Sequence, residues 1–424
     1  MKKNSQEKIP LDIAGLLFSY TKNKKWSNTY RFSAILKEDV DGELLKKAVT
    51  MLYHRFPTYF VRLTTGFFWK QYKNPPLDVD RLVTCSKSHC APIDTREKDL
   101  PLFRIHYWEK RISIDMFHGV TDGYGTMIFM KTLLATYFNL QGCNIPATHE
   151  ILDLNEAPKA EEFEDGIIKF YKKGGDTLKR KEPASYQHYV KEEDIPFHVI
   201  QLKFSASELK KITKAAGFSV TQYLATVYAY SFYVNKDPKD KRPLKIQFPV
   251  DMRKPFGLNT LRNFSLVTTL TIPNRDKPYS FDELLGIVKD QLAKGSDKEY
   301  LQKMINTNAS DALMPVAKYS PSFMKKPVLL IGFKMYGERL MTAPFSNVGI
   351  FDVPEEMQDK IEYCEAIIGK TTLNSINTAA LTYGDNLIVS FGSTKARRDV
   401  QDTFAEFIRS LGIEVEYTLG KPED

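Results

Sequence analysis

Segments with the periodicity of strands and segments with the periodicity of helices follow one another through all 424 residues of this chain. Apolar and polar side chains alternate in Thr29–Leu36, which predicts a strand, whereas the apolar residues of Gly42–Phe56 recur at helical spacing up to Pro57. Because this mixture continues in both halves, we expect a mixed α/β (α+β) fold. The other elements predicted in the first half are strands over 58–63, 67–72, 104–108 and 111–118 and a helix over 122–140, with Thr121 as its N-cap.

A charged segment poor in aliphatic residues, 150–196, separates the two halves. We interpret it as a crossover connection between two domains, residues 1–180 and 181–424; surface structure within a single domain is the alternative. Val220–Val234 is apolar on nearly every side, which predicts a buried helix. The other elements predicted in the second half are strands over 198–204, 244–252, 266–272, 361–368, 379–383 and 387–391, a strand that ends at Phe345, and helices over 206–216, 281–294, 298–309, 327–340 and 398–411.

The composition excludes several classes of protein. With 42% hydrophobic and 26% charged residues, the chain can bury a sizeable core, which excludes a mainly disordered or disulfide-stapled protein. The net charge of +8 is compatible with an anionic ligand or an acidic protein partner, but its distribution does not suggest a nucleic-acid-binding surface. We expect the four cysteines to be reduced thiols in a cytoplasmic protein, without a secretory signal or a membrane span.

The segment with the most chemical information is His118-Gly119-Val120-Thr121-Asp122-Gly123, which has the form His-x-x-x-Asp-Gly. Strand alternation places His118 on the same face as Ile114 and Met116, at the carboxyl end of a strand that turns into a helix. A neutral imidazole at such a position can reach a cleft and act as a general base near pH 7. The alternative is a structural histidine at a strand end, with Asp122 as a carboxylate that stabilises the helix N-terminus.

This motif resembles that of the acyl-CoA-dependent acyltransferase superfamily, which includes chloramphenicol acetyltransferases, peptide-synthetase condensation domains and alcohol acetyltransferases. Two further segments occur in the family's order. Pro249-Val250-Asp251-Met252-Arg253, followed by Asn263-Phe264, resembles a strand and loop that supply a structural arginine, and Ser346-Asn347-Val348-Gly349 resembles a turn near the active site. The single motif histidine and the early Pro10-Leu11-Asp12 are most similar to the alcohol acetyltransferase branch.

The chain departs from the family pattern at two places. Many members carry a second histidine directly before the first, where this chain has Phe117. The Asp-Phe-Gly-Trp-Gly segment of some plant members is absent, and its nearest counterpart is the predicted hairpin turn Tyr383-Gly384-Asp385-Asn386. These departures argue against the plant branch but leave the His-x-x-x-Asp motif complete.

The resemblance implies two chloramphenicol-acetyltransferase-like domains with an active-site channel between them. It also implies transfer of an acetyl or longer acyl group from an acyl-CoA co-substrate to a hydroxyl or amine, with neither a bound cofactor nor a metal. His118 would be the general base, and no covalent acyl-enzyme would form. Asp122 would pair with Arg253 and support the loop, while Gly123 would allow close packing at the helix start.

The tetrahedral intermediate of such a reaction carries an oxyanion, which needs a positioned hydrogen-bond donor. The candidates are Ser346, Asn347 and the backbone N–H groups of the same predicted turn. A simple structural turn before Gly349 is the alternative.

Two other functions stay open at this point. A condensation-like protein would take its acyl donor from an acidic carrier protein, which the positive charge permits. A non-catalytic binding protein could keep the same fold, although the intact His118 and Asp122 argue against it. Cys85, His89 and Cys90 fit no common zinc spacing, so we expect no metal site there.

Overall fold

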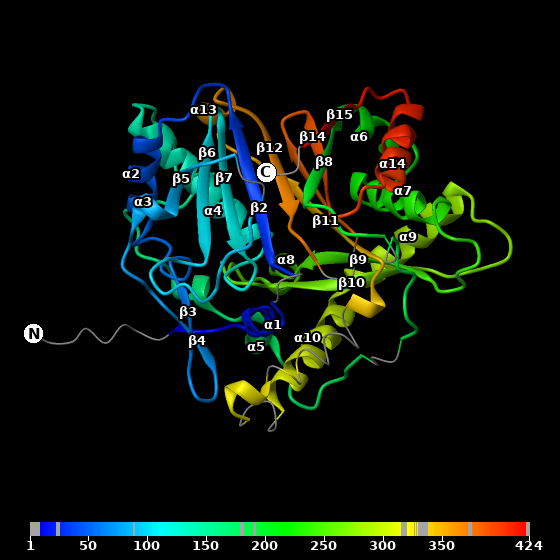
Figure 1. Cartoon of the computed structure of the whole chain (residues 1–424), viewed down its shortest axis with the longest axis horizontal. Coiled ribbons are helices and arrows are strands. Elements are labelled where there is room, and N and C mark those ends of the chain that lie inside the picture. The colour runs from blue at the N-terminus through cyan, green and yellow to red at the C-terminus, as the bar shows by residue number, and fades with distance from the viewer. Residues whose placement is uncertain are drawn as a thin grey trace, which may run out of the picture.

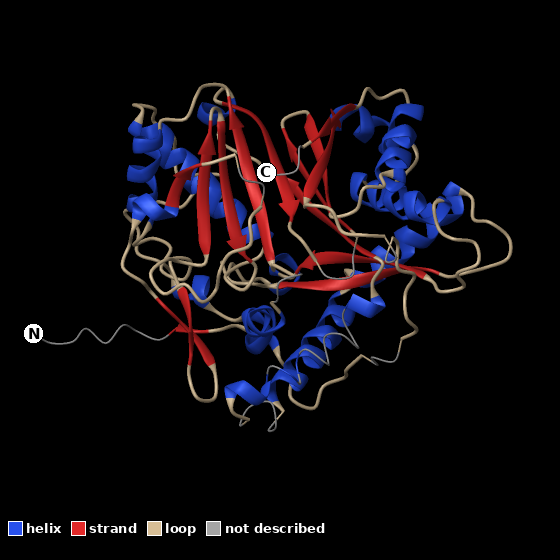
Figure 2. Ribbon diagram, viewed as in Figure 1, coloured by secondary structure: helices blue, strands red, loops and turns tan. Residues whose placement is uncertain are grey.

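Two β-sheets stand side by side in the computed structural model of the chain, with helices packed along their outer sides (Figures 1 and 2). The structure describes residues 9–22, 26–87, 90–178, 182–189, 192–314, 320–325, 327, 329, 338–371 and 375–420. Each sheet has its own apolar core, one built mainly from the first half of the chain and one from the second. The two-sheet α/β architecture agrees with the predicted fold class.

The first sheet has the strand order β12-β2-β7-β6-β5 within the described residues. Its neighbours are antiparallel, apart from the parallel pair β5 and β6. Helix α4 is buried along nearly its whole length and packs with α2 against this sheet, because its sequence is apolar almost all round. The elements are β2 Thr29–Leu36, α2 Gly42–Leu52, α3 Val79–Leu82, β5 Val83–Cys85, β6 Phe103–Trp108, β7 Arg111–Phe117, α4 Gly123–Leu140 and β12 Ile361–Ile368.

The second sheet has the order β10-β9-β11-β13-β14-β8-β15 among the residues described. Strand β11 runs parallel to both of its neighbours, whereas the other pairs are antiparallel. Helix α7 is the central core helix of this half, as its apolar sequence predicted. The elements are β8 His198–Ser205, α6 Ala206–Ala215, α7 Val220–Val234, β9 Leu244–Asp251, α8 Arg253–Phe256, β10 Ser265–Ile272, α9 Phe281–Gly295, β11 Ala343–Ile350, β13 Ile376–Tyr383, β14 Asn386–Ser393, α14 Asp399–Ser410 and β15 Glu416–Leu419. The short helix α13 Glu355–Gln358 follows β11 in sequence but packs its Met357 in the core of the first sheet.

A third, smaller layer lies below the two sheets in Figure 1. A short sheet of order β1-β4-β3 packs there with α1, α5 and α10. Its elements are β1 Ile9–Pro10, α1 Ile13–Thr21, β3 Arg62–Thr65, β4 Lys70–Lys73, α5 Gly166–Phe170 and α10 Lys298–Leu313, and two 3-10 turns lie at Ala160–Phe163 and Glu338–Leu340. Helix α1 was not predicted, although Asp12 directly before an apolar run is a typical N-cap pattern, and its carboxylate accepts a hydrogen bond from the Gly15 N–H.

Strand β12 joins the two halves. It belongs to the second half of the sequence, yet it pairs with β2 along Tyr30–Leu36 in the first sheet. It also contacts β13 and β14, so it stands where the two sheets meet. The predicted division at residues 180 and 181 falls next to residues 179–181, which lie outside the described residues, and stays a prediction.

The face of β2 predicted to be polar is buried as well. Arg31 is about 1% exposed and donates two hydrogen bonds, of 2.6 and 2.7 Å, to Asp115 on β7. Nearby, Gln201 of β8 donates to Glu365 of β12 across the junction. These polar side chains can be buried because each carboxylate is paired with a donor, so alternation alone does not decide whether this face of β2 meets water.

Several predicted boundaries differ from the structure. Helix α2 ends at Leu52 and is followed by turns, and the strand predicted over 58–63 begins only at Arg62. The N-cap of α4 is Asp122, not Thr121. The helix predicted over 327–340 lies largely outside the described residues.

Candidate active site

His118 follows the last residue of β7, at the edge of the sheet where the chain turns toward α4. Its backbone N–H donates to the Asn28 carbonyl (2.8 Å). Its ring stacks on Phe18 of α1 at a centroid distance of 4.4 Å and meets the edge of Tyr30 at 4.9 Å. The ring position is therefore fixed from two sides, by one helix and one strand.

The ring of His118 is neutral over a wider pH range than a histidine in water. Burial lowers its pKa below the usual 6.5, because the charged imidazolium loses its hydration. The nearby Asp122 carboxylate and Asn263 side chain act in the opposite direction. Nδ1 is buried and has no hydrogen-bond partner in the described part of the chain. A neutral imidazole with one enclosed nitrogen can accept a proton at the other.

Asp122 is buried and bound by donors on every side. Arg253, the partner that the resemblance implies, donates from Nη2 to both carboxylate oxygens, at 2.9 and 3.0 Å. The backbone N–H groups of Phe264 (2.8 Å) and Gly125 (3.2 Å) donate to the same carboxylate. None of these bonds involves His118. The carboxylate therefore joins the start of α4 to the second half of the chain. Its role is structural.

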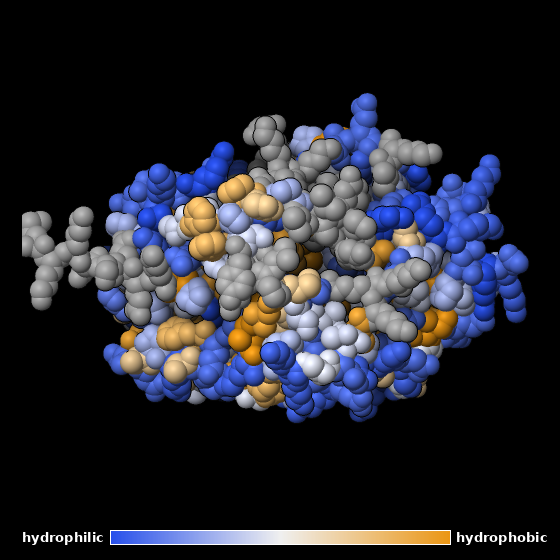
Figure 3. All heavy atoms as spheres, turned by 90° about the horizontal axis from the view of Figure 1, so that it is seen from below, coloured by the Kyte–Doolittle hydropathy of each residue, from blue (hydrophilic) through white to orange (hydrophobic). Residues whose placement is uncertain are grey.

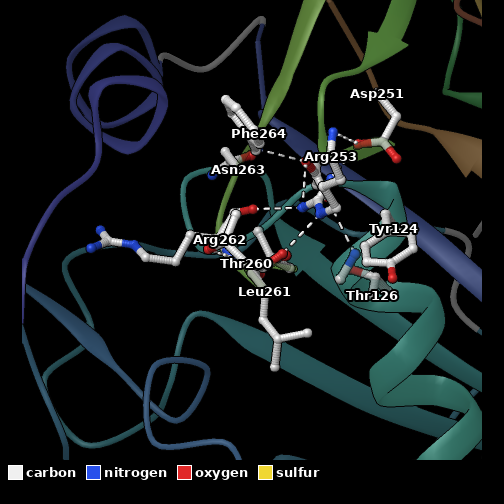
Figure 4. Close-up of polar contacts among 12 residues, drawn as sticks. Tyr124, Thr126, Asp251, Arg253, Thr260, Leu261, Arg262, Asn263 and Phe264 are labelled. Carbon is white, nitrogen blue, oxygen red and sulfur yellow. Dashed lines mark hydrogen bonds and ion pairs between the residues drawn. The ribbon is translucent and has the colours of Figure 1, made fainter. Parts of the chain in front are cut away.

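Arg253 is the centre of this network (Figure 4). Besides Asp122, its guanidinium donates to the Thr260 carbonyl (2.8 Å), the Arg262 carbonyl (2.7 Å) and the Asp251 carboxylate (2.7 Å). The face of the guanidinium lies 4.4 Å from the centroid of the Tyr124 ring. One arginine thus holds the loop before β10 against the helix that follows the histidine motif.

The glycine that allows close packing is Gly125 and not the predicted Gly123. A methyl group at Gly123 would meet only Phe32 and Val348, at ordinary distances of 3.7 and 3.8 Å. At Gly125 it would lie 2.1 Å from the Thr121 hydroxyl oxygen, 2.5 Å from the Tyr59 hydroxyl and 2.7 Å from the Leu261 carbonyl oxygen. The close approach belongs to the second glycine because that turn of α4 packs against the loop held by Arg253.

A second buried polar cluster lies behind residues 118–125, which we call the histidine loop. Asp12 is about 1% exposed, and its carboxylate lies 3.3 Å from Nε of Arg262. Burial raises the pKa of Asp12 to about 6, against the opposing effect of Arg262. The amide nitrogen of Asn263 lies between Asp12 (3.5 Å) and the Gly119 carbonyl (3.4 Å), whereas its amide oxygen is buried without a partner in the part of the chain that the structure describes.

Ser346 and Asn347 lie within β11, not in a turn after it. Strand β11 continues to Ile350 with a bulge between Asn347 and Gly349, where Gly349 has a φ of 99°. Asn347 donates from Nδ2 to Thr221 of α7 (2.9 Å) and accepts from the Gly349 N–H (3.2 Å). Its side chain therefore fixes the bulge and is already engaged.

The side chain of Ser346 lies on the face of β11 opposite to that of Asn347. Phe345 packs in the second core and Asn347 contacts α7, so alternation turns Ser346 to the opposite face of β11. Val348 also leaves the α7 side, because it packs against the first core and lies next to Gly123 of the histidine motif. Ser346 is half-buried, and its hydroxyl makes no hydrogen bond to another described residue. One N–H of the Asn347 amide is engaged with Thr221, whereas the donor of the Ser346 hydroxyl is unused among the described residues.

The described residues contain no group of three His, Cys, Asp or Glu side chains that could hold a metal ion. Cys85 is exposed and Cys90 buried, while His89 lies outside the described residues. No helix in the described ranges has the length and apolar character that a membrane span requires.

Sequence reasoning missed several residues of this site. Phe18 and Asp12 come from a helix that was not predicted, and their contacts with the histidine loop depend on how that helix packs. Asn263 was noted within a motif but given no role. The only local signal for these residues is the N-cap pattern at Asp12.

The chain is similar to known proteins in its fold but not detectably in its sequence. Neither a protein-family model nor a curated protein sequence matches the chain. Among solved structures, polyketide synthase associated protein 5 from Mycobacterium tuberculosis is 12% identical with a TM-score of 0.61, over 97% of this chain and 99% of that one. TRI101 of F. sporotrichioides, complexed with coenzyme A and T-2, is 14% identical with a TM-score of 0.59, over 96% and 99%.

A third similar structure is TRI3 trichothecene 15-O-acetyltransferase from Fusarium sporotrichioides, which is 11% identical with a TM-score of 0.60 over 95% of this chain and 94% of that one. At such low identity the likeness defines the fold alone. The chain has the two-domain chloramphenicol-acetyltransferase-like fold that the His-x-x-x-Asp-Gly resemblance implied, over nearly its whole length.

Proposed function

We propose that this protein is an acyltransferase that moves an acetyl or longer acyl group from an acyl-CoA thioester to a hydroxyl or amine acceptor. The observation that carries the proposal is the state of His118. It stands at the end of β7 between Phe18 and Tyr30, is kept neutral by burial, and is followed by a loop that Asp122 and Arg253 lock in place. A structural histidine does not need this arrangement, whereas a general base does.

In the proposed reaction, the acceptor oxygen or nitrogen attacks the thioester carbonyl carbon as His118 removes its proton. Because Nδ1 is buried, we assign the proton transfer to Nε2. The tetrahedral intermediate collapses with cleavage of the carbon–sulfur bond, and the imidazolium returns the proton to the leaving thiolate. The acyl group passes directly to the acceptor, and no acyl-enzyme forms.

Two further side chains receive roles in this proposal. Asn263 would be a positioning residue: its unpaired amide oxygen and the unpaired Nδ1–H of His118 can bond to each other, which keeps the lone pair on Nε2. Ser346 would donate to the oxyanion, since its hydroxyl is not used elsewhere among the described residues. Asn347 would act only through the shape of the bulge.

The similar structures support this class of chemistry. TRI101 was solved with coenzyme A and with T-2, and TRI3 is a 15-O-acetyltransferase. We therefore favour an oxygen acceptor and a CoA donor, of the alcohol acetyltransferase kind, in a cytoplasmic protein, as the sequence predicted.

The test is release of free thiol from acetyl-CoA and longer acyl-CoA esters in the presence of a panel of alcohols and amines. We expect acceptor-dependent release that falls by about a thousandfold or more in His118→Ala, because the reaction loses its general base. His54→Ala is the matched control, since His54 is an exposed histidine far from β7 in sequence. Equal rates in His118→Ala and the parent chain would remove His118 from the mechanism.

The same assay separates the two alternatives. If no CoA ester is used but an acyl group is transferred from a phosphopantetheinylated carrier protein, the donor part of the proposal is wrong and the histidine chemistry stands. If neither donor reacts with any acceptor in the panel, while His118→Ala leaves the protein's biological effect unchanged, the chain is a binding protein with this fold.

A further inference from the structure

Helix α1 reaches the histidine loop from a layer of the molecule that meets solvent. Figure 1 shows α1 below the first sheet, and Figure 3, which views the molecule from below, shows hydrophobic side chains exposed on that lower face. Leu17 of α1 is 38% exposed, whereas Phe18, the next residue, stacks on the His118 ring with the two ring planes 24° apart. The stack therefore joins the histidine to a helix that has water on one side.

Asn28, which directly precedes β2, bonds to both partners of this stack. Its side-chain Nδ2 donates to the Phe18 carbonyl (3.0 Å), and its backbone carbonyl accepts the N–H of His118 (2.8 Å). The same Nδ2 donates to the hydroxyl oxygen of Thr21, the last residue of α1, at 3.3 Å. One buried residue thus connects the end of α1 to the backbone of the histidine.

Asn28 makes these bonds in a backbone conformation that most side chains avoid. Its φ of 51° lies in the left-handed region, where asparagine is more frequent than other non-glycine residues. Its Oδ1 is buried and accepts no hydrogen bond from a described residue. Backbone strain and an unpaired buried acceptor both disfavour the folded state. Because both occur at this one residue, its geometry indicates a role beyond stability.

Phe18 gives the His118 ring an apolar neighbour among several titratable ones. The titratable groups on the described elements packed around the ring are Asp122 with its partner Arg253, Tyr30 on β2, Tyr72 on β4 and, beyond Asn263, Asp12 with its partner Arg262. Burial raises the pKa of both tyrosines, so neither changes its charge where a histidine titrates. If Phe18 left the ring, water would enter and favour the imidazolium.

We propose that Asn28 is a positioning residue that holds Phe18 against the ring of His118. It acts through the stack, by fixing the end of α1 to the backbone of the histidine. Its importance for catalysis rests on the proposed function, in which His118 is the general base. Its effect on the protonation of the ring does not depend on that function, so the two can be tested separately.

The test is an NMR titration of the full chain, in which the imidazole signals of His118 are assigned by their loss in His118→Ala. Asn28→Gly keeps the left-handed backbone and the bond to the His118 N–H, but removes the amide that holds α1. We expect the pKa of His118 to rise toward the usual 6.5 in Asn28→Gly, because water reaches the ring. In the acyl-transfer assay, kcat should fall about tenfold with little change in KM, since the base is misaligned.

Two further variants separate positioning from stability. Phe18→Ala should raise the pKa of His118 as well, and the double variant Asn28→Gly, Phe18→Ala should add nothing to it, because both changes remove the same stack. Asn235→Gly is the matched control, since the Asn235 amide donates to a carbonyl (2.9 Å) and to the Thr403 hydroxyl (2.8 Å) at the end of α7. It should lower the melting temperature and leave the pKa of His118 and kcat unchanged.

The proposal is overturned if Asn28→Gly lowers the melting temperature but leaves the pKa of His118 in place, because Asn28 would then be structural only. It is also overturned if the effects of Asn28→Gly and Phe18→Ala add in the double variant. An unchanged pKa in Phe18→Ala overturns it too, and this variant decides the question if Asn28→Gly does not fold. If the parent chain transfers no acyl group while Asn28→Gly still raises the pKa of His118, the proposed function fails and the positioning role stands.

Discussion

The histidine loop, residues 118–125, and the bulge of β11, residues 346–349, face each other through Gly123 and Val348 but are built differently. In the histidine loop, Asp122 is buried and bound by Arg253 and two backbone N–H groups. In the bulge, the side chains are half-buried, and among the described residues only Asn347 makes a side-chain hydrogen bond outside the strand.

This difference shows how a site can combine a rigid loop, which holds the base, with a strand bulge that keeps a hydrogen-bond donor free. The position of a general base must be fixed to within a fraction of an ångström. This requires several buried hydrogen bonds that together hold the loop in one conformation. A hydroxyl can donate to the oxyanion only if it does not already donate to another group of the protein. In a loop where every polar group is hydrogen-bonded, no such hydroxyl would remain. Four predictions test this division, from the largest expected effect to the smallest.

The largest effect is expected at Arg253, because its removal leaves the Asp122 carboxylate buried without its counterion. Arg253→Met should lower the free energy of unfolding by about 3–5 kcal/mol and also reduce acyl transfer. Urea unfolding followed by fluorescence measures the first effect. Arg275→Met, which breaks the exposed pair with Glu283, should leave the unfolding curve in place. If both variants unfold alike, the Arg253 network does not lock the histidine loop.

The two glycines of the motif should respond in opposite ways. Gly125→Ala should lower stability by about 1–3 kcal/mol, because the methyl group collides with the Thr121 hydroxyl and the Leu261 carbonyl. Gly123→Ala meets only ordinary contacts and should be neutral or slightly stabilising, since alanine favours a helix. Melting temperatures of the two variants are compared directly. A larger loss at Gly123 would reverse our assignment of the close approach.

In the bulge, Ser346→Ala and Asn347→Ala should separate catalysis from stability. Ser346→Ala should lower kcat by about a hundredfold with an unchanged melting temperature, because it removes the oxyanion donor alone. Asn347→Ala should cost about 1 kcal/mol of stability through the lost bonds to Thr221 and Gly349, with a smaller effect on kcat. An unchanged kcat in Ser346→Ala would assign the oxyanion to Asn347 or to the backbone N–H groups of the bulge.

The smallest effect is a shift of the pH profile. Because burial lowers the pKa of His118, the neutral base should persist below pH 6.5, and kcat/KM should fall only as the pH drops through that lower value. Asn263→Asp places a carboxylate beside the ring, which favours the imidazolium. The acid limb of the profile, where kcat/KM falls, should therefore move to higher pH.

The matched control for that profile is Asp12→Asn, since the pKa of Asp12 is raised to about 6 and its titration could contribute to the same limb. If the acid limb of the kcat/KM profile disappears in Asp12→Asn but does not move in Asn263→Asp, it is caused by the titration of Asp12. In that case the pH dependence reports the buried cluster behind the loop and not the base.

Much of the local structure could be predicted from the sequence. Strands β2 and β12 and helix α7 have the predicted bounds, because their periodicity is strong and caps or turns flank them. His118 could be placed at a strand end for the same reason. The bulge could not be predicted: Ser346 to Gly349 reads as a turn, and only pairing with β13 keeps it in a strand.

The sequence by itself determined which segments become strands and helices, which faces are apolar, and that a histidine lies between a strand end and the helix that follows it. These are properties of neighbouring residues. The tertiary structure alone decided that β12 completes the first sheet, that Arg31 and Asp115 are buried as an ion pair, and that Asn263 and Asp12 lie behind the histidine loop. Those contacts join residues far apart in the chain, where no local period or cap carries a signal, and they form only when whole layers pack together.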